Sequence, residues 1–172
     1  MPNNGKPIKP GEESDHMGKK VGQLGNKEVW KYNLGVQKTF SVFDPETRRS
    51  QLVVVGISYP DNPDSFVIQG LYSGPRNETR AVNLYAWLVN KLGLTLVSDR
   101  KQSPGGYRVW QELERRYGRF MNIHAFNTRT NEPLNLTTKD EPETHVDKDL
   151  LHKGGPNIKD IPSNIRLVAS PK

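Results

Sequence analysis

The sequence predicts a mixed α/β (α+β) domain, with a sheet flanked by two main helices and an extended arm at each end. The middle of the chain alternates β-branched runs with two segments whose apolar residues recur at spacings of three and four. Both ends are rich in proline, glycine and charged residues and hold few apolar ones. We therefore expect an extended or disordered arm over 1–27, a folded core over 28–130 and an extended tail over 131–172.

The first half of the core predicts strands. Residues 29–44 contain short alternations and several aromatic residues, which predict one or two strands, and DPETRRS follows as a turn. Residues 51–60 form a β-branched run typical of a buried strand. After the turn sequence DNPD, residues 65–74 predict the next strand. We expect 51–74 to be an antiparallel hairpin.

The segment 78–93 predicts the first helix. Its apolar residues form one stripe, and Gly93 supplies a helix stop. The stripe consists of Ala81, Leu84, Tyr85, Leu88 and Leu92. A short strand over 94–99 should follow.

The segment 103–118 predicts the second helix, which Gly118 ends. Ser103 is a good N-cap and Pro104 suits the first helical position. Residues 119–130 then alternate as a strand does. In the tail, the apolar islands Leu150–Leu151 and Ile165–Ala169 could dock on the core or on another chain.

The composition limits the chemistry. The chain has 172 residues and no cysteine, which excludes disulfides, thiolate metal sites and a cysteine nucleophile. Its four histidines show no metal-ligand spacing, so we expect no metal. The first residues have no apolar core of a signal peptide, and no apolar run approaches the roughly 18 residues that span a membrane. We expect a cytoplasmic protein with no membrane partner.

The formal net charge is +6 and the pI is about 9.5. Such a charge suits a polyanionic partner, either nucleic acid or a phosphorylated small molecule, and it also serves solubility. The densest basic stretch contains Arg100, Lys101, Arg108, Arg115, Arg116 and Arg119.

The order of elements over 51–127 resembles the second half of an acyltransferase domain of the GNAT superfamily. In that superfamily a hairpin leads into a phosphate-cradling turn and a long helix, and a strand, a helix and a further strand follow. The motif [Q/R]-x-x-G-x-[G/A] opens the helix, and RNETRA (76–81) stands at that place with Thr79 in the glycine position. The resemblance implies acetyl-CoA as cofactor. The residues implied to bind it are Arg76, Asn77, Thr79, Arg80 and Ala81.

The physical basis of this site is the first turn of a helix, where free N–H groups and the positive end of the dipole attract a pyrophosphate. Arg76 and Arg80 add positive charge, whereas Glu78 adds a negative one. The same residues also fit an ordinary helix start with surface arginines, and the sequence leaves both interpretations open.

Two residues are candidates for proton transfer. Many relatives in the superfamily use a carboxylate as general base, and Asp99 ends the central strand; capping the turn after it is the alternative role. The resemblance also implies a tyrosine that protonates the leaving thiolate, which points to Tyr107, whereas Tyr117 falls on an apolar stripe. Gly105 and Gly106 either expose backbone N–H groups to a ligand or allow the helix to pack closely on a strand.

Two functions follow, with a third beside them. The first is a divergent acyl-CoA-dependent N-acyltransferase. The second is a non-catalytic phage structural, virion-associated or interaction protein whose arms bind partner chains, because LVSDRKQSPGGYRVWQEL also resembles segments of phage-encoded proteins of GNAT-like fold. Its location would then be the host cytoplasm or the virion. The third is a nucleic-acid-binding protein.

Overall fold

The computed structural model describes residues 18–74, 76–98, 104–127, 132–137, 145–147 and 165–172. The chain divides into two compact units, Met1–Trp87 and Leu88–Lys172. The division falls inside helix α1 (Ala81–Leu92). Within the described residues, no helix is long and apolar enough to cross a membrane.

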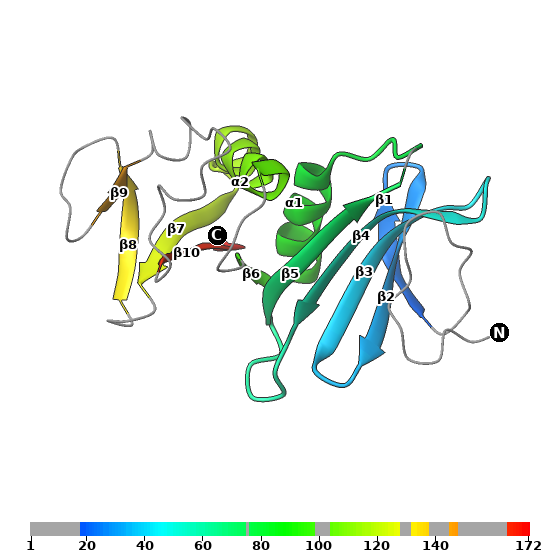
Figure 1. The fold of residues 1–172 in the computed structure, drawn as a ribbon, viewed down its shortest axis with the longest axis horizontal. Coiled ribbons are helices and arrows are strands. Elements are labelled where there is room, and N and C mark those ends of the chain that lie inside the picture. The colour runs from blue at the N-terminus through cyan, green and yellow to red at the C-terminus, as the bar shows by residue number, and fades with distance from the viewer. Residues whose placement is uncertain (1–17, 75, 99–103, 128–131, 138–144, 148–164) are drawn as a thin grey trace. The chain divides into compact units, whose positions relative to one another are not determined.

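The first unit contains a meander of five antiparallel strands (Figure 1). Gly25 and Gly35 occupy the first position of the two-residue turns that join the first three strands, with φ of 61° and 62°. Glycine with positive φ at this position is typical of the type II′ turn, whose twist matches that of the strands. The strands are β1 (Lys19–Leu24), β2 (Lys27–Leu34), β3 (Gln37–Asp44), β4 (Arg49–Ile57) and β5 (Ser65–Ser73).

The turn between β3 and β4 is built around Asp44. Its carboxylate accepts hydrogen bonds from the Glu46 N–H at 3.0 Å and from the Thr47 hydroxyl at 3.2 Å. The Arg48 N–H donates to the Asp44 carbonyl at 2.8 Å, and Arg48 has a φ of 59°. The polar groups of the turn are thus hydrogen-bonded to one another, and they hold a buried carboxylate at the end of β3.

One face of this sheet is covered by the start of α1. The Trp87 ring lies over Gly22, where an added Cβ would be 2.5 Å from it, and the indole N–H donates to a carbonyl of β1 at 2.7 Å. Gly22 pairs with the fully buried Val29, which pairs with Val42. Residues paired directly across strands share a face, so this row faces the core of the unit.

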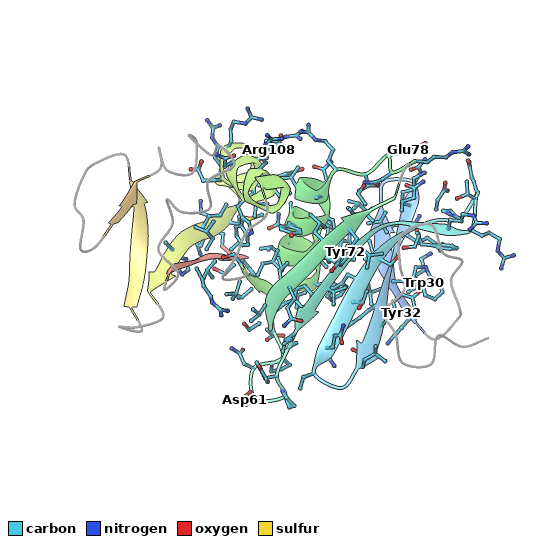
Figure 2. All side chains as sticks on the ribbon, in the orientation of Figure 1. Trp30, Tyr32, Asp61, Tyr72, Glu78 and Arg108 are labelled. Carbon is cyan, nitrogen blue, oxygen red and sulfur yellow. The ribbon has the colours of Figure 1, made fainter. Side chains whose placement is uncertain are left out.

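The opposite face carries a smaller apolar cluster. Trp30, Val53 and Tyr72 belong to one cross-strand row. Tyr32 and Val53 are buried, with Trp30 and Val55 packed against them. Tyr72 is 54% exposed, and Figure 2 labels it together with the two β2 aromatics. An aromatic surface therefore lies on the face away from α1.

The strands of the second unit follow one another in the order β6-β10-β7-β8-β9. Strand β10 runs antiparallel to both β6 and β7 and lies between them. β7 and β8 are antiparallel, and β8 and β9 are parallel. The elements are β6 (Thr95–Val97), α2 (Pro104–Tyr117), β7 (Met121–Asn127), β8 (Glu132–Thr137), β9 (His145–Asp147) and β10 (Ile165–Pro171). Its buried side chains include Trp110, Leu113, Met121, Ala125, Leu167 and Ala169.

The structure confirms the fold class, a mixed sheet with two helices. The hairpin expected over 51–74 is present as β4 and β5. Gly93 ends α1 with a φ of 70°, the left-handed conformation common at C′, and the Leu94 N–H donates back to the Leu88 carbonyl at 3.2 Å. The expected N-cap Ser103 lies outside the described residues.

The structure differs from the expected arms in two places. Strand β1 lies within 1–27, which we expected to remain outside the fold. The strand was not predicted because it is an edge strand with exposed lysines and lacks the apolar pattern of a buried strand. The expected tail over 131–172 contributes β8, β9 and β10, and the island Ile165–Ala169 does dock, as a strand between β6 and β7. Leu150–Leu151 lies outside the described residues.

Candidate functional site

The candidate site is the loop between β5 and α1, which is the place the sequence predicts for an anion-binding turn. The Gly74 N–H donates to the Gln51 carbonyl at 2.8 Å, which fixes the start of the loop to β4. The Asn77 N–H then donates to the Gly74 carbonyl at 3.3 Å and turns the chain. The loop is therefore anchored to the sheet before it reaches the helix.

Asn77 organises the rest of the loop through its side chain. Its Nδ2 donates to the Thr79 carbonyl at 2.7 Å and to the Ser73 hydroxyl at 3.0 Å. Its Oδ1 accepts the Thr79 N–H at 2.9 Å, which makes an Asx turn. The resemblance gave both residues to the cofactor. In the structure the Thr79 amide is bonded within the loop, and the Asn77 side chain shapes the backbone.

The helix start itself follows at once. The Arg80 carbonyl accepts the Asn83 N–H at 3.0 Å and the Leu84 N–H at 3.4 Å, so Arg80 occupies the N-cap position and Ala81 is the first helical residue. The side chains of Arg76 and Arg80 are exposed. Two arginines thus precede the first helical turn, at the positive end of the α1 dipole.

Glu78, the acid of the loop, is paired with a buried lysine. Lys27 Nζ lies 3.2 Å from Glu78 Oε2 and 3.5 Å from Asp44 Oδ2. The side chains of Lys27 and Asp44 are only 6% and 7% exposed, whereas that of Glu78 is 70% exposed. The lysine therefore joins a buried carboxylate of the sheet to an exposed carboxylate of the loop.

The electrostatics of this cluster keep both buried groups charged. Burial alone would lower the pKa of Lys27, but its hydrogen bond to Glu78 and the charge of Asp44 raise that pKa above its ordinary value. Burial would likewise raise the pKa of Asp44, yet the Glu46 amide and the Lys27 charge hold it below its ordinary value. Lys27 is thus shared between two carboxylates, and the cluster of Lys27, Asp44 and Glu78 keeps a net formal charge of −1.

Gln51 extends the cluster toward the loop. Its Nε2 donates to Asp44 Oδ2 at 3.3 Å, while its backbone carbonyl accepts the Gly74 N–H. Its Oε1 is buried and has no partner within the described part of the chain. Gln51 of β4 therefore links the polar cluster to the loop through two hydrogen bonds.

The predicted site residues divide between the two units. Arg76, Thr79 and Ala81 lie with the other loop residues in the first unit. Asp99 lies outside the described residues. Tyr107 belongs to the first turn of α2 in the second unit, where only its backbone is described. The structure brings the expected cofactor residues together, and the two expected proton-transfer residues remain predictions.

Sequence reasoning missed Lys27, Asp44 and Gln51. Lys27 fell in the segment expected to be an arm, and Asp44 appeared to be only a turn residue. Polar residues at strand ends are common, so their positions in the sequence do not show which of them meet in one cluster. Among the described residues, no group of three or more potential ligands could hold a metal ion.

Comparisons with protein families, curated proteins and solved structures find no match for this chain.

Proposed function

We propose that this chain is a divergent acyl-CoA-dependent N-acyltransferase whose cofactor diphosphate is held by the loop before α1. The observation that carries the proposal is the charge arrangement of this loop. Arg76 and Arg80 are exposed at the helix start, and the opposing Glu78 is paired with Lys27. Arg76, Arg80 and Lys27 carry three positive charges against the two negative charges of Glu78 and Asp44, so a diphosphate meets a loop and cluster of net formal charge +1 at the helix terminus.

The donors present fit an anionic diphosphate. The first turn of a helix presents backbone N–H groups that lack intrahelical partners, here at Ala81 and Val82. Arginine guanidinium groups add charge-assisted hydrogen bonds to phosphate oxygens. The Thr79 amide is already used by Asn77, so in this loop the two guanidinium groups replace part of the contact that a glycine backbone would make.

The order of elements adds support. Hairpin β4–β5, the loop, α1, β6, α2 and β7 follow one another as in the acyltransferase domains that the sequence resembles. No helix precedes β4 among the described residues. The helices that normally help to form the acceptor site are thus not seen in that part of the described chain.

The chemistry of the transfer would use two further residues. A bound acyl-CoA supplies an activated thioester carbonyl. Transfer to an acceptor amine would form a C–N bond and break the C–S bond of this thioester. We assign Asp99 to take the proton from the attacking amine and Tyr107 to give a proton to the leaving thiolate, as the resemblance implies.

Calorimetric titration with acetyl-CoA tests the proposal. Wild-type protein should bind with micromolar affinity, and Arg76→Glu should abolish binding. Lys19→Glu is the matched control, because it reverses the same charge on an exposed residue at the far end of β1 from Lys27. Absence of heat at millimolar acetyl-CoA, or equal affinity in all three proteins, would refute the cofactor site.

A non-catalytic interaction protein, of a phage structural or virion-associated kind, is the second candidate. The aromatic face around Trp30 and Tyr72 favours it, because half-exposed aromatic side chains are typical of protein interfaces. Because the expected terminal arms contribute β1, β8, β9 and β10 to the fold, on this proposal the aromatic face would bind the partner chain. Failure of acetyl-CoA binding together with capture of a defined partner, lost in Tyr72→Asp, would establish it.

A further inference from the structure

The end of α2 forms a basic corner that lies outside the proposed cofactor loop. We define this corner as Arg115, Arg116, Arg119, Phe120 and Lys172. Two of the arginines are in the last turn of α2, and Arg119 and Phe120 follow in the turn to β7. Lys172 reaches the corner from the end of β10, where its Nζ donates to the Arg119 carbonyl at 3.0 Å.

The corner is open to solvent. Arg116 and Arg119 are exposed, and the Arg115 side chain is 67% exposed although its guanidinium lies 3.8 Å from Glu112. Arg108 lies two turns earlier on the same face of α2 as Arg115 and is also exposed (Figure 2). An ion pair of this length at the surface holds a guanidinium only weakly. The arginines are therefore accessible to an external anion.

Helix stability explains only part of this arrangement. Cations in the last turn of a helix interact favourably with its dipole, which accounts for Arg115 and Arg116. It does not account for Arg119 and Lys172, which lie beyond the helix, nor for an aromatic ring among them. Phe120 is 62% exposed, whereas its neighbour Met121 is 2% exposed.

An exposed phenylalanine that directly follows a helix end with three arginines, where Lys172 is bonded to the Arg119 carbonyl, suits one class of ligand. The cations pair with phosphates, and the flat ring stacks on a base. Stacking on a lone surface ring requires an unpaired base, because the bases of a duplex are stacked on one another. We propose that this basic corner binds single-stranded nucleic acid, with Phe120 as the stacking platform and the four cations as phosphate contacts.

Fluorescence anisotropy of a labelled oligothymidine 20-mer tests the proposal on the full chain. Affinity should fall with salt, with a log–log slope of about −3 if four phosphates are neutralised, since each contributes about −0.7 on a single strand. Arg116→Glu should weaken binding and make this slope shallower. Phe120→Ala should weaken binding roughly 5-fold or more with the slope unchanged.

Three controls separate stacking, charge and folding. Phe120→Trp should restore the affinity lost in Phe120→Ala. An abasic strand of equal length should bind the Phe120→Trp and Phe120→Ala proteins with equal affinity. Lys19→Glu should change binding little, because it alters the same net charge elsewhere. Circular dichroism confirms that each variant folds.

The proposal stands apart from the acyltransferase assignment, because Arg116→Glu should leave the acetyl-CoA titration unchanged. No binding of the 20-mer at low salt would overturn it. Binding that is insensitive to both Phe120→Ala and Arg116→Glu would also overturn it, as would binding of anionic phosphatidylserine vesicles in place of the 20-mer.

Discussion

Lys27 and Glu78 form an ion pair, with Nζ and Oε2 3.2 Å apart, that joins the start of β2 to the loop before α1. The same ammonium group lies 3.5 Å from Asp44, so one buried cation serves two carboxylates. The contact ties the loop to the sheet and places a cation between the two carboxylates. The proposed function and the stability of the first unit both depend on this lysine.

Replacing Lys27 by methionine should strongly destabilise the fold, because Asp44 would be left as a buried charge without a cationic partner. Removing one partner of a buried pair typically lowers the free energy of unfolding by about 3–5 kcal/mol. Urea denaturation measures the change. Glu78→Gln is the control and should lower it by less than about 1 kcal/mol, since Glu78 is largely exposed. A Lys27→Met protein as stable as the wild type would contradict this account.

Stability should fall in acid more steeply than in an Asp44→Asn protein. The folded state lowers the pKa of Asp44, so this group stabilises the fold above its unfolded pKa of about 3.9. That stabilisation is lost as the pH falls through the lower folded pKa. The raised pKa of Lys27 acts oppositely: its contribution is full below about pH 10 and is lost as the pH rises through the folded value. Unfolding free energies from pH 7 to pH 2.5 test the acid limb, and parallel curves for both proteins would argue against it.

Asn77→Ala should loosen the loop, because three side-chain hydrogen bonds to Ser73 and Thr79 disappear together. We expect the free energy of unfolding to fall by about 1–2 kcal/mol, since exposed hydrogen bonds contribute modestly. Asn90→Ala, an exposed position on α1, is the matched control and should cause no loss. Chemical denaturation measures the free energy of unfolding of the two variants. Equal values would show that the Asn77 side chain does not hold the loop.

Gly22→Ala should disturb the contact between β1 and Trp87. The new Cβ would lie 2.5 Å from the ring, so the ring or the strand must move. Overpacking of this kind lowers stability by about 1–3 kcal/mol. Gln23→Ala, on the neighbouring exposed residue, should be nearly neutral. Tryptophan fluorescence during unfolding follows the effect, and an unshifted Gly22→Ala curve would show that the edge strand adapts freely.

The sequence was most informative where one face of an element is apolar. Leu84, Tyr85 and Leu88 of the stripe that predicted α1 are buried, whereas Ala81 and Leu92 at its ends are only partly buried. Strand β10 was harder, because its partners β6 and β7 are distant in the sequence and no local pattern specifies the pairing. Local periodicity therefore predicted the two helices and the strands of the expected core, but not the strands of the expected arms or the strand order of the sheet.

The candidate site shows the same limit. Arg76 and Arg80 could be placed before a helix from their position alone, and the structure puts them there. The pairing of Glu78 with Lys27 could not be predicted, since it depends on how β2 and the loop come together. The roles of Asp99 and Tyr107 rest on the resemblance.

A series of proteins that differ in the charge of the loop tests the central claim most directly. The measurement is the dissociation constant of acetyl-CoA for Arg76→Glu, wild type and Glu78→Gln under one buffer condition. The account predicts that affinity rises in that order, with Glu78→Gln binding about 2- to 5-fold more tightly than wild type, the range expected for one exposed charge. Equal constants in all three proteins, or no binding at all, would contradict the claim that this loop holds the cofactor.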